Sequence, residues 1–298
     1  MTCPHTRKFL DDARVNFVTK GGPHLASYRL RILIPARQLA RLGCVVSIGE
    51  YDPSADIHVF SKHWDTDDVE AAIKSKCSIY DICDYHGDRE EVHNHYCDMI
   101  WASDVVFVAS PILASFYGLE DYAHITDPYE FETREPRFHP DNVNLLWYGH
   151  QSNLPTLSNL ELDREYMLEI VTNAKHPAIT PWSHGAMRKA FEKAAITIIP
   201  TDDSKSWKSP NRMVESINAG VFVVANDMPA YRGYEMYLGD IQRGIEWARH
   251  NPSQVMKKLK SAQKIVQKKH SPTAVGEKWY DCISVAVRSS GKGSQTST

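Results

Sequence analysis

Apolar residues in this chain of 298 residues fall into short runs that alternate with amphipathic stretches. In the first half, each apolar run has the length of a buried β-strand, and the stretches between runs repeat apolar positions at helical spacing. Pro35 predicts a kink or a restart in the longest of these stretches. The predicted strands are 14–18, 44–48, 57–60, 78–82 and 105–108, and the predicted helices are 26–42, 67–74, 91–101 and 111–117. This alternation predicts an α/β fold with a parallel, doubly wound sheet.

The second half repeats the pattern after residues 127–142, which are rich in Pro, Glu and Arg and therefore predict a linker. Its predicted strands are 143–148, 167–172, 196–199 and 221–225, with helices at 183–193, 211–219, 240–250, 252–269 and 272–288. A chain of this length commonly forms about two domains. We therefore predict Rossmann-like domains at 1–140 and 141–288, and a disordered tail at 289–298, where Ser, Gly and Thr predominate.

The composition argues against several classes of protein. The net charge of −3 and the isoelectric point near 6.5 give no overall attraction to nucleic acid or acidic membranes. No apolar run is long enough to span a membrane, and the first residues are polar and charged, unlike a signal peptide. The 6 cysteines lack the paired spacing of zinc sites, so we expect reduced thiols in a cytoplasmic protein.

The most informative stretch runs from Lys208 to Ala225, where a basic turn opens an amphipathic helix that ends at Gly220 and enters an apolar strand. Lys208 and Arg212 are four residues apart, and a helix start offers free N–H groups, a combination that suits a phosphate or diphosphate. Glu215, one turn into the helix, can accept hydrogen bonds from a sugar hydroxyl. The alternative interpretation is an ordinary αβ unit with a solvated basic start.

This stretch, with the two α/β patterns, resembles GT-B glycosyltransferases of the retaining, metal-independent group 1 (family 4-like), over roughly residues 14–288. The resemblance implies two Rossmann-like domains facing a cleft, with C-terminal helices that pack back toward the first domain. Glu215 matches the second Glu of the family's Glu-x7-Glu motif, which binds ribose hydroxyls. Trp207 stands where the family has the first Glu, which contacts the transferred sugar, so the donor sugar and turnover itself stay open.

The resemblance also implies a donor site. Gly21 and Gly22 follow the first strand, where the family has a glycine loop over the donor phosphate, although a tight turn without a ligand is the alternative. The family has a glycine at the position of Gly149, often with a basic residue beside it. Segments 171–173 and 181–184 would surround the nucleobase. The predicted donor-binding residues are Gly21, Gly22, Gly149, His150, Ser152, Asn153, Lys208, Asn211, Arg212, Met213 and Glu215.

Candidate catalytic residues follow the strand 78–82, in a segment that resembles an Asp-x-x-Asp-x-His sequence of related transferases. His86 would hydrogen-bond the donor sugar or lie beside the reacting centre, and Asp84 would orient it or act as a base. A surface loop with capping aspartates is the alternative. His93, His95 and Cys97 suggest metal ligands by type, but a zinc site needs a fuller ligand set, so no metal is predicted.

The sequence thus predicts an enzyme of the hexosyltransferase type that moves a sugar from a UDP- or GDP-linked donor, without a metal and with retention. No cofactor is expected besides the donor substrate. The acceptor is a glycan, a lipid head group or a modified nucleobase in DNA, and the oligomeric state stays open. Two alternatives remain: a sugar-nucleotide epimerase that uses Asp84, His86 and Asp202, and a scaffold that binds a nucleotide sugar without turnover.

Overall fold

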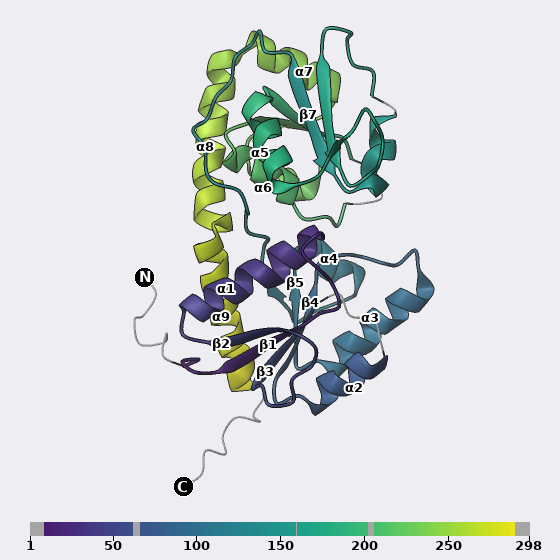
Figure 1. Cartoon of the computed structure of the whole chain (residues 1–298), viewed down its shortest axis with the longest axis vertical. Helices are drawn as coiled ribbons and strands as arrows, with labels where there is room; N and C mark the ends of the chain where they lie inside the picture. Colours follow the sequence, from purple (N-terminus) through teal and green to yellow (C-terminus); the bar gives the residue numbers. More distant parts are fainter. Residues whose placement is uncertain (1–8, 62–65, 159, 202–205, 290–298) are drawn as a thin grey trace. The chain divides into compact units, whose positions relative to one another are not determined.

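A computed structural model describes residues 9–61, 66–158, 160–201 and 206–289. These residues form two compact units (Figure 1). The first unit contains the chain up to Glu130, the short segment Trp207–Ser209 and the chain from Ser271 onward. The second unit contains Phe131–Ser206 and Pro210–His270. Of the predicted tail at 289–298, Ser289 is instead the last residue of a helix, and residues 290–298 lie outside the described residues, as does the predicted epimerase residue Asp202.

The first unit is built on a parallel sheet whose described strands have the order β2-β1-β3-β4-β5-β6. The strands are β1 (Arg14–Val18), β2 (Val45–Gly49), β3 (Ile57–Ser61), β4 (Ser78–Ile82), β5 (Val105–Val108) and β6 (Ala123–His124). The helices are a π-helix η1 (Tyr28–Leu33), α1 (Ile34–Arg41), α2 (Thr66–Lys74), α3 (Glu90–Ala102), α4 (Pro111–Phe116) and α9 (Pro272–Ser289). The strand order reverses between β1 and β3, and ligands bind beside such a switch point in α/β sheets.

Both faces of the first sheet are covered, because successive strand residues enter different apolar clusters. Val15 and Phe17 of β1 pack with residues of η1, α1 and α9, whereas Val18 packs with residues of α2, α3 and α4 (Figure 1). Trp279 of α9 contacts Phe17 and Phe107, with ring centroids 5.8 and 5.2 Å apart. The predicted return of the C-terminal chain to the first domain is thus made by α9.

The second unit contains a parallel sheet of order β12-β11-β10-β7-β8-β9. Its strands are β7 (Asn144–Gly149), β8 (Met167–Thr172), β9 (Thr180–Pro181), β10 (Ile196–Ile199), β11 (Phe222–Ala225) and β12 (Tyr237–Leu238). Its helices are the 3-10 helices η2 (Gln151–Leu157) and η4 (Pro229–Tyr231), with α5 (His184–Lys193), α6 (Asn211–Asn218), α7 (Ile241–His250) and α8 (Pro252–His270). The order reverses between β7 and β10, which is the Rossmann arrangement.

The division between the units differs from the one expected from the sequence. Residues 131–140, predicted as the end of the first domain, belong to the second unit. Arg134 N–H donates to Asn218 O at 3.0 Å and Arg137 N–H to Gly220 O at 3.1 Å, so this segment is tied to the end of α6. Gly220 permits the approach, because it has a φ of +74° and a Cβ there would lie 2.4 Å from Glu135 O. The second unit also ends at His270 instead of residue 288, since α9 completes the core of the first unit.

The first unit contains a buried ionic network centred on Arg31 of η1, which is 1% exposed. Its guanidinium donates to both carboxylate oxygens of Asp81, at the end of β4, and to Asp127 at 3.3 Å. Ser61 Oγ also donates to Asp81, and Ser209 Oγ donates to Asp127 at 2.5 Å. Burial alone would lower the pKa of Arg31, but the two carboxylates raise it above its usual value. The network joins η1, β4 and the segment 207–209 within one unit.

Candidate nucleotide-sugar site

The carboxyl end of β7 and the first turn of α6 are held together at the switch point of the second sheet. Arg212 Nη1 donates to Tyr148 O at 3.4 Å, and the Tyr148 hydroxyl donates to Arg212 O at 2.6 Å. The same carbonyl accepts from Ser216 Oγ at 2.9 Å. Two residues predicted from the sequence, Gly149 and Arg212, are therefore brought to one place. A Cβ at Gly149 would lie 3.6 Å from Arg212 Nη1, so only a small residue leaves room beside the guanidinium.

Tyr231, in η4, also contacts this guanidinium. It is 2% exposed, and burial raises the pKa of its hydroxyl, a shift that Arg212 opposes through a side-chain hydrogen bond. Arg212 itself is only half-buried. Its guanidinium is thus oriented by Tyr148 and Tyr231 and still reaches solvent. A planar cation held in this way suits two oxygens of a phosphate group.

The start of α6 differs from that of α5 and α7. Ser183 and Asp240 cap α5 and α7 with their own side chains, whereas the N-cap residue of α6 is Pro210, which makes no such bond. The first N–H groups of any helix have no intrahelical partner, and they attract anions. Asn211 was expected at or near the N-cap and is the first helical residue. Met213 is fully buried, so only its N–H, and not its side chain, is placed to contribute.

The loop after β7 is shaped by its own polar side chains. His150 caps η2, since its Nδ1 accepts from Ser152 N–H at 3.2 Å and lies 2.9 Å from Ser152 Oγ. Asn153 N–H donates to His150 O at 2.9 Å. Asn173, which follows β8, accepts from Gln151 N–H at 2.9 Å. His150, Ser152 and Asn153 therefore form one turn at the carboxyl edge of β7, next to the end of β8.

The predicted nucleobase region lies further along the same edge. Trp182 follows β9, and its backbone N–H donates to Thr172 O at 2.9 Å. Its ring packs edge-on to that of His184, with the centroids 5.1 Å apart. His184 also contacts the ring of Phe131 at 5.5 Å. Glu215, predicted to bind ribose, is 5% exposed, and its Oε2 accepts from Phe131 N–H at 3.4 Å. The structure thus gives Glu215 a contact within the unit, and its ribose role stays a prediction.

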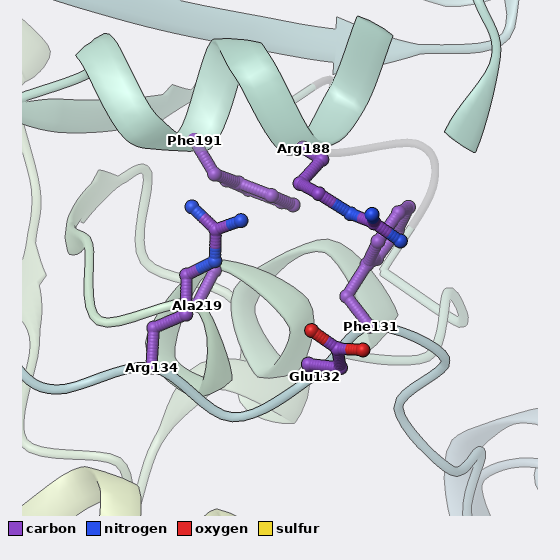
Figure 2. A pocket seen from close by; sticks show the side chains of 6 residues that line it. All are labelled: Phe131, Glu132, Arg134, Arg188, Phe191 and Ala219. Atoms are coloured by element: carbon purple, nitrogen blue, oxygen red, sulfur yellow. The ribbon is translucent and has the colours of Figure 1, made fainter. Parts of the chain in front are cut away.

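A small pocket in the second unit lies away from these groups. It is lined by residues of the segment after Glu130, of α5 and of the end of α6: Phe131, Glu132, Arg134, Arg188, Phe191 and Ala219 (Figure 2). Arg134 is also paired with Glu192 at 2.8 Å. An eight-residue helix is about 12 Å long, and this pocket is at the opposite end of α6 from Arg212. It contains none of the predicted site residues.

In the first unit, Gly21 and Gly22 follow β1 at the switch point, as expected. Gly21 N–H donates to Thr19 Oγ1 at 3.1 Å, and Leu25 N–H donates to Gly22 O at 3.0 Å. Neither glycine has a positive φ, so the turn does not require glycine for its backbone conformation. A Cβ at Gly22 would lie 3.2 Å from the His24 ring. The two glycines are therefore needed to leave space over this turn and not for its backbone conformation.

The predicted catalytic residues follow β4. The ring of His86 packs edge-on to buried Tyr96 at 5.2 Å, and Cys83 Sγ donates to Asp84 at 3.8 Å. Both residues are half-buried. The structure therefore places them in one loop at the carboxyl edge of the first sheet, in contact with aromatic side chains.

Lys208, predicted beside Arg212 at the diphosphate, belongs to the first unit. Its ammonium lies 5.9 Å from the centroid of Trp207, and the carbonyl of Trp207 accepts from Ser110 Oγ at 3.0 Å. Trp207, in place of the family's first Glu, packs into the apolar cluster around β4 and α3. A tryptophan at this position thus packs against the core of the first unit and stays half-buried.

Cys97 Sγ lies 3.7 Å from His93 Nε2, one turn away on α3. Within the described residues, no group of three or more His, Cys, Asp or Glu side chains is placed to hold a metal ion. Among the helices of the described residues, none is both long and apolar enough to cross a membrane.

By sequence, no family model and no curated protein matches the chain. Solved structures do match it. An alpha-glucosyltransferase in complex with UDP and a 13-mer DNA containing a HMU base has a TM-score of 0.65 and 9% identity, over 91% of this chain and 99% of its own. HepE of Anabaena, in complex with UDP and glucose, has a TM-score of 0.66 and 9% identity over the same shares. The chain has the GT-B fold.

TarM shares the GT-B fold more distantly, with a TM-score of 0.55 and 10% identity over 76% of this chain and 54% of its own. The fold predicted from the sequence is therefore confirmed, in both sheets. The strand order by itself indicates a ligand site beside the switch point of each sheet. Sequence reasoning missed Tyr148 and Tyr231, which contact Arg212, whereas Asn173 belongs to the segment 171–173 that was expected around the nucleobase. The only signal of the two tyrosines was position, since each lies at or after the carboxyl end of a strand.

Proposed function

We propose that this chain is a glycosyltransferase that moves a sugar from a nucleotide diphosphate sugar to an acceptor hydroxyl. The observation that carries the proposal is the Arg212 guanidinium, held by Tyr148 O beside Gly149 and the first turn of α6. A guanidinium, a glycine turn and unpaired helix N–H groups at one switch point match the charge and size of a diphosphate.

These groups also suit the chemistry of transfer. The bond from the anomeric carbon to the diphosphate oxygen breaks, a bond to the acceptor oxygen forms, and the acceptor's proton is released with the nucleoside diphosphate. Negative charge grows on the departing diphosphate, so fixed donors that face it lower the barrier. Arg212 and the amides of residues 211–213 supply such donors, and the proposal needs no metal ion or other cofactor. Retention at the anomeric carbon is part of the proposal, on the family resemblance.

UDP is the first nucleotide to test, because an alpha-glucosyltransferase and HepE of the same fold were solved with it. A thermal-shift screen of UDP, GDP, ADP, CMP and TDP, with their sugar conjugates and without added metal, tests the proposal. A ligand that binds the native state raises the melting temperature by mass action. We expect UDP or GDP to do so. No shift with any of them at millimolar concentration would refute the proposal.

Calorimetry on two variants then tests the site. Arg212→Ala should weaken nucleotide binding by about 1.5–3 kcal/mol, the range for hydrogen bonds to charged groups. Arg232→Ala is the matched control, since Arg232 is an exposed arginine of the same unit, paired with Asp227. Equal affinities for the two variants would remove Arg212 from the site. Glu215→Ala should weaken binding with little change in melting temperature, whereas a large drop in melting temperature with unchanged affinity would make Glu215 structural.

A scaffold that binds the donor without turnover is the second candidate, and Trp207 favours it. The family's carboxylate at this position contacts the transferred sugar, and an indole cannot accept its hydrogen bonds. Release of UDP from UDP-glucose, followed by enzymatic detection of UDP, separates the two. UDP release above the background rate supports the transferase, and binding without release supports the scaffold.

A further inference from the structure

Four aromatic side chains gather at the carboxyl end of β4 in the first unit, and we name this group the aromatic corner: Tyr85, Phe116, Tyr117 and Trp207. The ring centroid of Tyr85 lies 4.6 Å from that of Phe116, 5.4 Å from Tyr117 and 6.4 Å from Trp207. Phe116 is 41% exposed, and the other three are half-buried. Tyr85 is therefore the centre of an aromatic surface that solvent reaches.

The corner is fixed in place by its surroundings. Tyr117 stacks on buried Tyr96 at 5.8 Å, and Ser110 Oγ holds the carbonyl of Trp207. Tyr85 folds over Gly87, where a Cβ would lie 2.0 Å from the Tyr85 hydroxyl oxygen. A larger residue at this position would displace the ring of Tyr85, so glycine permits the observed orientation of Tyr85. Preorganised rings lose little entropy when a ligand stacks on them.

The chain around the corner is strongly acidic. Between Cys83 and Tyr122, Arg89 is the only Lys or Arg. The carboxylates of the loop after β4 and of the start of α3 are Asp84, Asp88, Glu90 and Glu91, whereas Asp104 lies at the amino end of β4, where it accepts from Ser78 N–H at 2.9 Å. A polyphosphate acceptor such as DNA is bound mainly through Lys and Arg, and like charges repel it. Lys208 lies over the ring of Trp207 and adds one positive charge, which is fewer than the negative charges of the carboxylates. The corner is thus unsuited to a nucleic acid.

We propose that the aromatic corner binds the sugar ring of an uncharged glycan, which is the acceptor of the transferase proposed above. The apolar C–H face of a pyranose packs on an aromatic ring, while its hydroxyls donate to carboxylates at the rim, such as Asp84. The corner and the predicted residues His86 and Asp84 belong to the same loop after β4, so a glycan there lies beside the candidate catalytic groups. This inference names the acceptor class and rests on the proposed function.

The test measures glycan and nucleotide binding separately, on the full chain. Saturation-transfer NMR and calorimetry, with and without UDP, are applied to maltotriose, cellotriose and chitotriose as uncharged probes, and to a DNA duplex as an anionic probe. We expect at least one uncharged probe to bind more tightly than the duplex. Tyr85→Ala and Phe116→Ala should each weaken that binding at least about tenfold, as loss of a stacking ring does in other proteins.

Trp101→Ala is the matched control, because Trp101 is an aromatic residue of α3 that is 79% exposed and lies outside the corner. It should leave glycan binding unchanged, and Tyr85→Phe, which keeps the ring, should retain it. Phe116 is exposed, so its variant should fold even if Tyr85→Ala does not. The inference is overturned if none of the uncharged probes binds, if binding is unaffected by both alanine variants, or if the duplex binds more tightly. UDP binding without glycan binding overturns this inference alone, and glycan binding without nucleotide binding overturns the proposed function alone.

Discussion

Replacement of Arg31 by methionine should destabilise the first unit strongly. Arg31 is 1% exposed, and its guanidinium pairs with both oxygens of Asp81, whose side chain has 0% exposure. Methionine fills a similar length of space but leaves Asp81 and Asp127 without their cation. Removal of one partner of a buried ion pair typically costs about 3–5 kcal/mol, because the remaining charge stays buried without compensation. We expect a loss in this range.

Urea unfolding followed by circular dichroism measures the loss, with Lys74→Met as the control. Lys74 pairs with Glu70 on the surface at 2.9 Å, and solvent screens an exposed pair of this kind, so its loss should cost little. The double variant Arg31→Met/Asp81→Asn removes both charges and should lose less than the two single losses combined. If Arg31→Met costs no more than Lys74→Met, the buried network does not stabilise the unit and the reasoning is wrong.

The stability of the Arg31→Met variant should depend on pH. Burial raises the pKa of the Asp81 carboxyl in the native chain, and Arg31 opposes that shift. Without Arg31 the opposing effect is gone, so the folded state binds a proton more readily than the unfolded state does. A raised folded pKa gives stability that is fully present below the unfolded pKa and is lost as pH rises through the folded one. The loss of stability caused by Arg31→Met should therefore shrink as the pH falls toward the pKa of an ordinary carboxyl group.

Three further predictions follow from the described contacts. Gly149→Ala should keep the affinity for the nucleotide, since a Cβ there makes only ordinary contact with Arg212 Nη1 at 3.6 Å. Gly149→Val should weaken nucleotide binding at least about tenfold, because the larger side chain displaces the guanidinium. Equal affinities of the two variants in calorimetry would refute this. Gly220→Ala should cost more in urea unfolding than Gly118→Ala, because both have positive φ but only Gly220 has a carbonyl oxygen 2.4 Å from the new Cβ, so equal losses would contradict the model of a close approach. Burial, with a nearby carboxylate, raises the pKa of Cys44 to about 11, so the stability that this thiol contributes is full below about pH 9 and is lost as pH rises through 11. Iodoacetamide should accordingly modify Cys44 much more slowly in the native chain than in urea at pH 8.5, and mass spectrometry showing equal rates would refute the shift.

Much of the fold was predictable because apolar runs and helical spacing are local properties of the sequence. The run Ser78–Ile82 is a strand, and the long periodic stretch 272–288 is the helix α9. The sequence assigned this stretch to the second domain, and only the family resemblance implied that it packs back toward the first; its place in the first unit depends on close approaches such as that of Gly276, where a Cβ would lie 2.3 Å from Gln38 Cβ. The structure divides the chain after Glu130 instead of near residue 140 for a similar reason, since the hydrogen bonds of residues 134–137 join positions far apart in sequence.

The candidate site was predictable in part. Gly149 and Arg212 were found because each follows a strand or opens a helix, where ligands bind in α/β sheets. Tyr148 and Tyr231 were missed, because a tyrosine within or after an apolar run gives no sign that its hydroxyl or ring contacts an arginine. The π-helix at Tyr28–Leu33 was also missed. Its two buried arginines, Arg29 and Arg31, pair with carboxylates far along the chain, and helical spacing gives no sign of such partners.

The position of α9 also affects how the chain folds during synthesis. Because the second unit lies between Glu130 and Ser271 in the sequence, the first unit is discontinuous and lacks Trp279 until the second unit has been synthesised. Until then, apolar side chains of β1 and β5 that pack on this tryptophan are without their cover, a state in which nascent chains recruit chaperones. The inserted unit precedes α9 in the sequence, so its chain is available for folding before α9 has been made. The first unit therefore depends on α9 to complete its core, and truncation of α9 should affect the half that is made first.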